Sequence, residues 1–245
     1  MAGFSTRFAT DVGPLEVPRG LISPAIFYHL VTHDYELPEL TLLDQHLHGD
    51  DRVIELGAGL GFLANRYGRR CPQQHHLAIE ANPVMSALAR RNTVGVPNVD
   101  VLNGLAARAA TGSGATAPTV PFYVYRDFWA SSTEPVHLHN PALRLLRTEA
   151  VPMLDLDALI TERRCTMLMC DIEGGEYDLI RTFDLRVPKI VMELHWSVLG
   201  FSRALEVVQT LHARGYQLSG SPDVLIALKA PPVPPPPVPS AAAAP

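Results

Sequence analysis

Cysteine, long apolar runs and basic clusters are all scarce in this 245-residue sequence. The three cysteines show no CxxC spacing, which argues against a disulfide framework or a zinc ribbon. No apolar run reaches the roughly 18 residues of a membrane span, and no signal-peptide core is present, so we expect a cytoplasmic protein without a membrane partner. The net charge of −5, with no basic run longer than two residues, argues against a nucleic-acid partner.

Hydrophobic residues make up 47% of the chain, which is ample for a buried core. Residues 1–50 are predicted to form a helical and irregular lead-in, with two short helices that meet near Tyr35 and Glu36. Residues 51–229 are expected to form the main domain, with Cys165 and Cys170 as buried thiols. The proline- and alanine-rich tail, residues 230–245, is predicted to be disordered.

The main domain alternates short apolar segments with helical ones. VIEL, HLAIE and VDVLN are typical of buried parallel strands, and helices are expected after the first two of them. VPFYVY alternates and is aromatic, which indicates a β-hairpin insertion, and YQLSG and DVLIALK are expected to close the sheet as an antiparallel pair. The pattern predicts an α/β, Rossmann-like fold: a mostly parallel sheet with helices on both faces.

A glycine-rich loop, ELGAGLGF, joins the first of these strands to its helix. Its glycines allow a ligand close to the backbone, and the helix N-terminus offers unpaired N–H groups, so we expect a nucleotide-like cofactor. The dinucleotide-binding pattern GxGxxG fits this loop only when it starts at Gly59, as Gly59, Gly61 and Ala64. An NAD-dependent oxidoreductase is therefore an alternative function. Glu80, at the end of the second strand, is placed to hold ribose hydroxyls of either cofactor.

Glu55 favours one of the two candidate cofactors, S-adenosylmethionine, over the other, NAD. It lies two residues before Gly57, where a carboxylate would repel a pyrophosphate but suits a ligand with an ammonium or sulfonium group. S-adenosylmethionine carries both groups, so the loop favours it, although an acid here can also cap the turn. The predicted cofactor-binding residues are Glu55, Gly57, Gly59, Gly61, Glu80, Ala81, Asn82, Asn103 and Gly104.

The segment CDIEGGEYD places four acids directly after an apolar strand. Alternation along an extended segment would put Asp171 and Glu173 on one side, at the sheet edge where α/β proteins bind ligands. Two neighbouring carboxylates suit a general base, and the alternative role for Asp171 is to orient the substrate or the cofactor amine. Glu176 and Asp178 have a simpler explanation as acids in the first turn of a helix.

The strand KIVMELH ends in a second pair of polar residues, Glu193 and His195. His195 is a further candidate base, with a structural hydrogen-bonding role as the alternative. The predicted catalytic residues are therefore Asp171, Glu173 and His195. Together with Glu193 they form an oxygen-rich group that would also suit Mg²⁺ or Ca²⁺, but the sequence does not decide this and we predict no metal.

Five segments in this order, VIELGAGLGFLA, AIEANP, VPMLDLDALI, LMCDIEGGEYDLI and KIVMELH, resemble the FkbM family of S-adenosylmethionine-dependent methyltransferases. The resemblance covers about residues 35–217, and the D-x-E-G-x-E segment is its most specific part. It implies a class I methyltransferase fold and, usually, O-methylation of a sugar or secondary metabolite. The loop departs from the family pattern, because members commonly carry Asn where this chain has Gly59.

The sequence therefore predicts an S-adenosylmethionine-dependent methyltransferase that acts on a hydroxyl of a small molecule or sugar. Methyl transfer to a hydroxyl needs in-line geometry and removal of one proton, which the acids after the strands could provide. The alternatives are an NAD-dependent oxidoreductase and a catalytically silent binding protein with the same fold.

Overall fold

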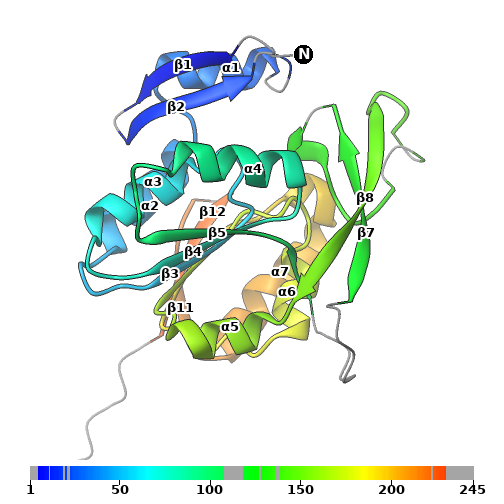
Figure 1. Cartoon of the computed structure of the whole chain (residues 1–245). Coiled ribbons are helices and arrows are strands. Elements are labelled where there is room, and N and C mark those ends of the chain that lie inside the picture. Colours follow the sequence, from blue (N-terminus) through cyan, green and yellow to red (C-terminus); the bar gives the residue numbers. More distant parts are fainter. Residues whose placement is uncertain are drawn as a thin grey trace, which may run out of the picture.

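The chain is described here by a computed structural model, shown in Figure 1. It describes residues 5–229 apart from 11, 19, 21–22, 108–117, 127, 136–137, 139 and 222. The tail predicted to be disordered, residues 230–245, lies outside the described residues. Among the described residues, no helix combines the length and apolar character that crossing a bilayer requires.

The chain begins with a β-hairpin where the sequence pattern predicted an irregular segment. Strands β1 (Ser5–Thr10) and β2 (Gly13–Pro18) pair antiparallel. Leu15 is fully buried beneath the hairpin, and the side chain of Asn92 exchanges two hydrogen bonds with the backbone of Glu16, at 2.9 and 3.1 Å. These long-range contacts hold the hairpin on the domain, and no local sequence signal reports them.

Two short helices follow, as predicted: α1 (Pro24–Thr32) and α2 (Leu37–His46). Between them Glu36 adopts a left-handed backbone conformation, with φ of 50°. The turn at Tyr35 and Glu36 carries both side chains to the wall of a large cavity that is described below.

A seven-stranded sheet forms the centre of the molecule, in the order β11-β12-β10-β9-β3-β4-β5. Five neighbouring strands are parallel, and β12 and β11 close the sheet as the predicted antiparallel pair. The strands are β3 (Val53–Leu56), β4 (His76–Glu80), β5 (Val99–Asn103), β9 (Met167–Cys170), β10 (Lys189–Glu193), β11 (Tyr216–Gly220) and β12 (Val224–Lys229). The chain order reverses between β3 and β9, which opens a crevice at their carboxyl ends.

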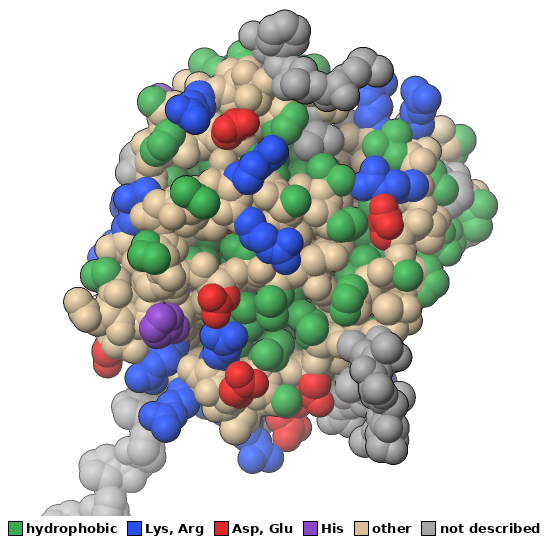
Figure 2. Space-filling view, in the orientation of Figure 1, with side chains coloured by type: hydrophobic (Ala, Val, Ile, Leu, Met, Phe, Trp, Pro, Cys, Tyr) green, Lys and Arg blue, Asp and Glu red, His purple; other side chains and the backbone are tan. Residues whose placement is uncertain are grey.

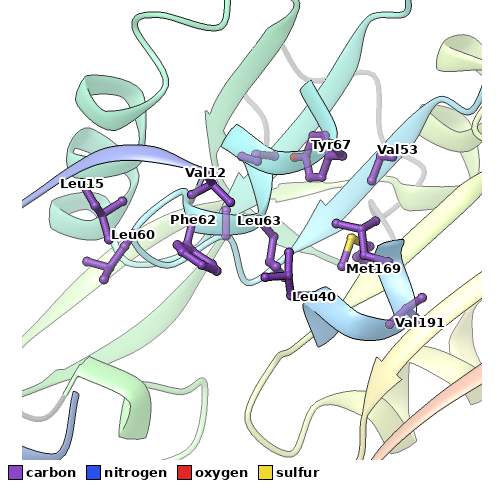
Figure 3. Packing of buried hydrophobic residues seen from close by; sticks show 14 of the residues in the cluster. Val12, Leu15, Leu40, Val53, Leu60, Phe62, Leu63, Tyr67, Met169 and Val191 are labelled. Atoms are coloured by element: carbon purple, nitrogen blue, oxygen red, sulfur yellow. The ribbon is translucent and has the colours of Figure 1, made fainter. Parts of the chain in front are cut away.

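Helices cover both faces of this sheet, as Figure 1 shows. One face is covered by α2, α3 (Phe62–Arg70) and α4 (Pro83–Asn92), and the other by α5 (Leu156–Arg163), α6 (Glu176–Thr182) and α7 (Trp196–Ala213). Figure 3 shows the packing on the first face, where Leu40, Leu63 and Met169 converge. Successive residues of each strand alternate between two apolar clusters, as the period of a buried parallel strand requires. The predicted mostly parallel, double-faced α/β fold is confirmed.

A second, three-stranded sheet contains the predicted hairpin insertion. Strands β7 (Thr119–Tyr125) and β8 (Leu145–Leu154) pair antiparallel, and β6 (Leu105–Ala106) runs parallel to β8. A 3₁₀ turn, η1 (Phe128–Ala130), follows β7. Since β6 begins two residues after β5 ends, this sheet lies beside the carboxyl edge of the central one and adds a wall to the crevice.

Charged side chains are dispersed over the face of the molecule shown in Figure 2, where acidic and basic groups lie among uncharged ones. The three cysteines are free and buried, as predicted for Cys165 and Cys170.

Candidate active site

The glycine loop lies between β3 and α3, and its three glycines, Gly57, Gly59 and Gly61, all have positive φ. A Cβ atom at position 57 would lie 1.6 Å from the carbonyl oxygen of Asp171, so glycine is required there. At Gly59 the space is open, and a Cβ atom would meet nothing closer than 3.9 Å. The loop therefore packs tightly against the acidic segment at one glycine and leaves open space at the next.

Glu80 fixes the shape of this loop from the end of β4. Its carboxylate accepts hydrogen bonds from the backbone N–H groups of Gly59, at 2.8 Å, and Asn82, at 2.7 Å. Burial raises the pKa of Glu80, against the effect of these hydrogen bonds. Asn103 donates to the carbonyl oxygens of Glu80 and Ala81, both at 2.9 Å, so the loops after β4 and β5 are tied together.

A cavity of about 680 Å³ opens at the carboxyl edge of the sheet. Its size is in the range of small-molecule sites. Seven of the predicted site residues line it: Gly57, Gly59, Glu80, Ala81, Gly104, Asp171 and Glu173. Four predicted cofactor residues do not, namely Glu55, Gly61, Asn82 and Asn103, and neither does His195.

The residues that lie off the cavity have other contacts. Asn82 caps α4 by accepting a hydrogen bond from Val84 N–H at 3.1 Å. Gly61 precedes α3, where a Cβ atom would lie 3.1 Å from the backbone of Ala89. Both residues shape the loops that line the cavity.

Glu55 is buried under α3 and accepts a hydrogen bond from the hydroxyl of Tyr67 at 2.8 Å. Burial raises its pKa to about 7, with the Tyr67 hydrogen bond acting in the opposite direction. Its carboxylate borders a small hollow of about 10 Å³, which adjoins the large cavity at Gly57 and Asp171. The predicted contact of Glu55 with a cofactor ammonium stays a prediction.

The acidic segment forms a turn, and the prediction that Asp171 and Glu173 project from an extended strand was wrong. Glu173 and Gly174 have φ of 50° and 99°, and the N–H of Gly175 donates to the carbonyl of Ile172 at 3.1 Å. The glycines allow the chain to reverse within a few residues of β9. Both acids nevertheless line the cavity, because the turn folds back over the sheet edge.

His195 brings the acids of the two strand ends together. Its Nε2 atom lies 3.5 Å from Asp171 Oδ1 and 3.3 Å from Glu173 Oε2. On the other side of the ring, Nδ1 lies 2.6 Å from Glu176 Oε1. Glu176 is fully buried, so its side chain does more than complement the helix dipole: it fixes the orientation of the His195 ring.

The electrostatics of the cluster follow from burial and like charges. Burial lowers the pKa of His195, but the hydrogen bond to Glu176 and the charge of Glu173 outweigh it and raise that pKa to about 9. Burial, offset by the charge of His195, raises the pKa of Glu173 to about 7. Burial and the charge of Glu193 raise the pKa of Asp171 well above its usual value. The raised pKa favours the protonated form of His195 at neutral pH, beside carboxyl groups whose own pKa values are raised.

Helix α2 and the residue before it add two acids, Glu39 and Glu36, that the sequence analysis did not assign to the site. Glu36 borders both hollows, and Glu39 faces the small one together with Glu193. Burial raises the pKa of Glu36, and it raises that of Glu39 to about 7. The chain separates Glu36 from Asp171 by more than half its length, so only the way α2 packs on β10 reveals the cluster. Asp171, Glu193 and His195 each place one atom within 4.8 Å of the others, a spacing that could hold a metal ion.

A family model described as the methyltransferase FkbM domain matches residues 57–218, about two thirds of the chain. The chain belongs to the FkbM methyltransferase family. The resemblance noted in the sequence is thereby confirmed, along with a Rossmann-like, class I methyltransferase fold and S-adenosylmethionine, rather than NAD, as the cofactor.

Solved structures similar to this FkbM methyltransferase are distant in sequence. A precorrin-6y C5,15-methyltransferase from Geobacter metallireducens GS-15 is 16% identical, with a TM-score of 0.47 over 80% of this chain and 88% of its own. An O-methyltransferase from Bacillus cereus, solved in complex with SAH, is 12% identical, with a TM-score of 0.44 over 86% of this chain and 84% of its own. A comparison with curated proteins found no match. The family assignment therefore rests on the family model.

Proposed function

We propose that this FkbM methyltransferase transfers the methyl group of S-adenosylmethionine to a hydroxyl oxygen of a small molecule or a sugar. The observation that supports the proposal is that Asp171 and Glu173 line the same cavity as Gly57 and Gly59 of the glycine loop. The backbone of Asp171 also lies directly against Gly57. A carboxylate is thus held next to the loop that receives the cofactor.

The lining of the cavity fits an adenosine-containing cofactor. Gly59 leaves open space beside the backbone, and Glu80 presents a carboxylate at the end of β4, suited to ribose hydroxyls. Apolar side chains from the second sheet, Leu105, Val120 and Phe122, form a wall suited to a purine ring. We assign cofactor contact to Gly57, Gly59, Glu80, Ala81 and Gly104.

Bound S-adenosylmethionine supplies an electrophilic methyl group on a sulfonium. The protein then has to hold the acceptor hydroxyl in line and take its proton, and orientation of this kind can contribute on the order of 7–11 kcal/mol. Asp171 and Glu173 are the two candidates for the proton acceptor, since both reach the cavity. His195 holds both carboxylates from behind, and Glu176 holds His195.

Two substitutions test this assignment. Asp171→Asn and Glu173→Gln each remove one candidate base, and loss of the true base should slow methyl transfer about 10²–10⁴-fold. The assay supplies S-adenosylmethionine with a labelled methyl group and a pool of hydroxylated metabolites and sugars. Glu162→Gln, an exposed acid on α5, is the matched control with the same change of charge.

Calorimetric titration with S-adenosylhomocysteine accompanies the assay, so that cofactor binding and catalysis are measured separately. Full transfer by both Asp171→Asn and Glu173→Gln would contradict the role of the carboxylates. Cofactor binding with no transfer to any acceptor would favour instead a binding protein that keeps the fold.

A further inference from the structure

The small hollow beside the main cavity is bordered by an unusual number of acids. Five acidic residues line it, from the turn before α2, from α2 itself, from β3, from the turn after β9 and from the end of β10: Glu36, Glu39, Glu55, Asp171 and Glu193. Its volume of about 10 Å³ corresponds to roughly the space that one water molecule or one small ion needs.

Within the described part of the chain, no lysine or arginine pairs with these acids. Glu55 has the hydroxyl of Tyr67 as its partner, and the ion-pair partner of Asp171 and Glu193 is His195, at 3.5 and 3.8 Å. Buried carboxylates are normally paired or coordinate a metal ion. The acids of the hollow thus outnumber the basic side chains that the described residues place beside them.

Two further observations concern the contacts of these carboxylates. Glu39 is only 7% exposed and lines the hollow, and its own backbone N–H is the hydrogen-bond donor to its carboxylate. Asp171 Oδ1 is buried and accepts no hydrogen bond from the described residues, and its ion-pair contact is Nε2 of His195 at 3.5 Å. Nearly all buried polar atoms in folded proteins have a hydrogen-bond partner, so the missing hydrogen bond at Asp171 Oδ1 requires an explanation.

The atoms that would bind an ion already converge. One oxygen of Asp171, one oxygen of Glu193 and one ring nitrogen of His195 lie within 4.8 Å of one another. Glu176 binds the Nδ1 side of His195, and Nε2 faces the carboxylates. A carboxylate behind a histidine is the usual means of orienting that histidine toward a metal.

We propose that Asp171, Glu193 and Nε2 of His195 bind a divalent cation at the edge of the hollow, with Glu39, which lines the hollow, as a further oxygen ligand or a ligand through water. Carboxylates with a single imidazole favour Mg²⁺ or Mn²⁺ over metals that prefer sulfur. An ion here would border the large cavity at Asp171 and could bind the acceptor oxygen and promote loss of its proton. That catalytic role, unlike the binding itself, rests on the proposed methyl transfer.

Titration of the full-length protein with Mn²⁺ tests the site directly. Binding removes the electron paramagnetic resonance signal of free Mn²⁺, so the readout does not depend on activity. We expect one site per chain, with competition by Mg²⁺. Glu193→Gln and Glu39→Gln should each weaken binding at least tenfold, whereas Glu162→Gln should leave it unchanged. Circular dichroism of each variant verifies that it folds.

Three results would overturn the proposal: no stoichiometric Mn²⁺ binding, equal affinity in all three variants, or complete displacement of Mn²⁺ by S-adenosylhomocysteine, which would assign the hollow to the cofactor. If Mn²⁺ fails to bind while S-adenosylhomocysteine binds and methyl transfer proceeds, only the cation site is wrong. If Mn²⁺ binds as expected but no acceptor is methylated, the cation site stands and the proposed function fails.

Discussion

Two glycines of the same loop should respond differently to the same substitution. Gly57 and Gly59 both have positive φ, of 84° and 48°, so alanine at either position carries a conformational cost of roughly 1–2 kcal/mol. Only at Gly57 would the new methyl group collide with fixed backbone, 1.6 Å from the carbonyl oxygen of Asp171. Such overpacking adds typically about 1–3 kcal/mol, because the turn after β9 must move.

We therefore expect Gly57→Ala to lower the free energy of unfolding by about 2–5 kcal/mol and Gly59→Ala by only about 1–2 kcal/mol. A typical domain is stable by about 5–15 kcal/mol, so both variants should still fold. Urea denaturation followed by circular dichroism measures the difference. Calorimetry with S-adenosylhomocysteine should show weaker cofactor binding in Gly59→Ala, because its methyl group would occupy open space at the cavity. Equal destabilisation of the two variants would refute the packing of Gly57 against Asp171.

Three further predictions concern buried polar groups. The pKa of Glu55 is about 7 in the folded protein, above its ordinary value of 4.5, so the protein loses stability as pH rises through this range and Glu55 ionises. Glu55→Gln should therefore raise the free energy of unfolding by up to about 3 kcal/mol at pH 8 and change it little at pH 4. Thermal unfolding at both pH values measures this. Glu176→Ala leaves Nδ1 of His195 without its acceptor and should lower the free energy of unfolding, measured by urea denaturation, by about 1–3 kcal/mol. Glu176→Gln keeps an oxygen there and should lower it less. Equal losses in the two variants would argue against this hydrogen bond. A disulfide-exchange reagent should label none of the three buried cysteines until the protein is unfolded, and rapid labelling of the native protein would contradict their burial.

Local patterns were sufficient for most of the fold. The apolar segments at residues 53–56, 76–80 and 99–103 form parallel strands because a strand buried on both faces has to be apolar throughout. The antiparallel pair at residues 216–229 was predictable in the same way. The hairpin at residues 5–18 was not, since Leu15 is buried by contacts with distant parts of the chain rather than by any local pattern.

For the candidate site, sequence predicted which sheet edge would carry the chemistry, but not the contacts there. Asp171, Glu173 and His195 do come together, as expected for residues after neighbouring parallel strands. Their arrangement on a turn, with Glu176 behind the histidine, depends on left-handed backbone at Glu173 and Gly174 that strand alternation could not anticipate.

The sequence by itself determined the strand-loop-helix order, the glycine loop, the family and therefore the cofactor, because these depend on neighbouring residues and on a specific order of motifs. Only the tertiary structure decided which acids share one hollow. Glu39 faces Glu193 because α2 packs against β10, and Gly57 meets Asp171 because β3 and β9 are adjacent in the sheet. Contacts of this kind are set by packing between segments far apart in the chain, which no local period records.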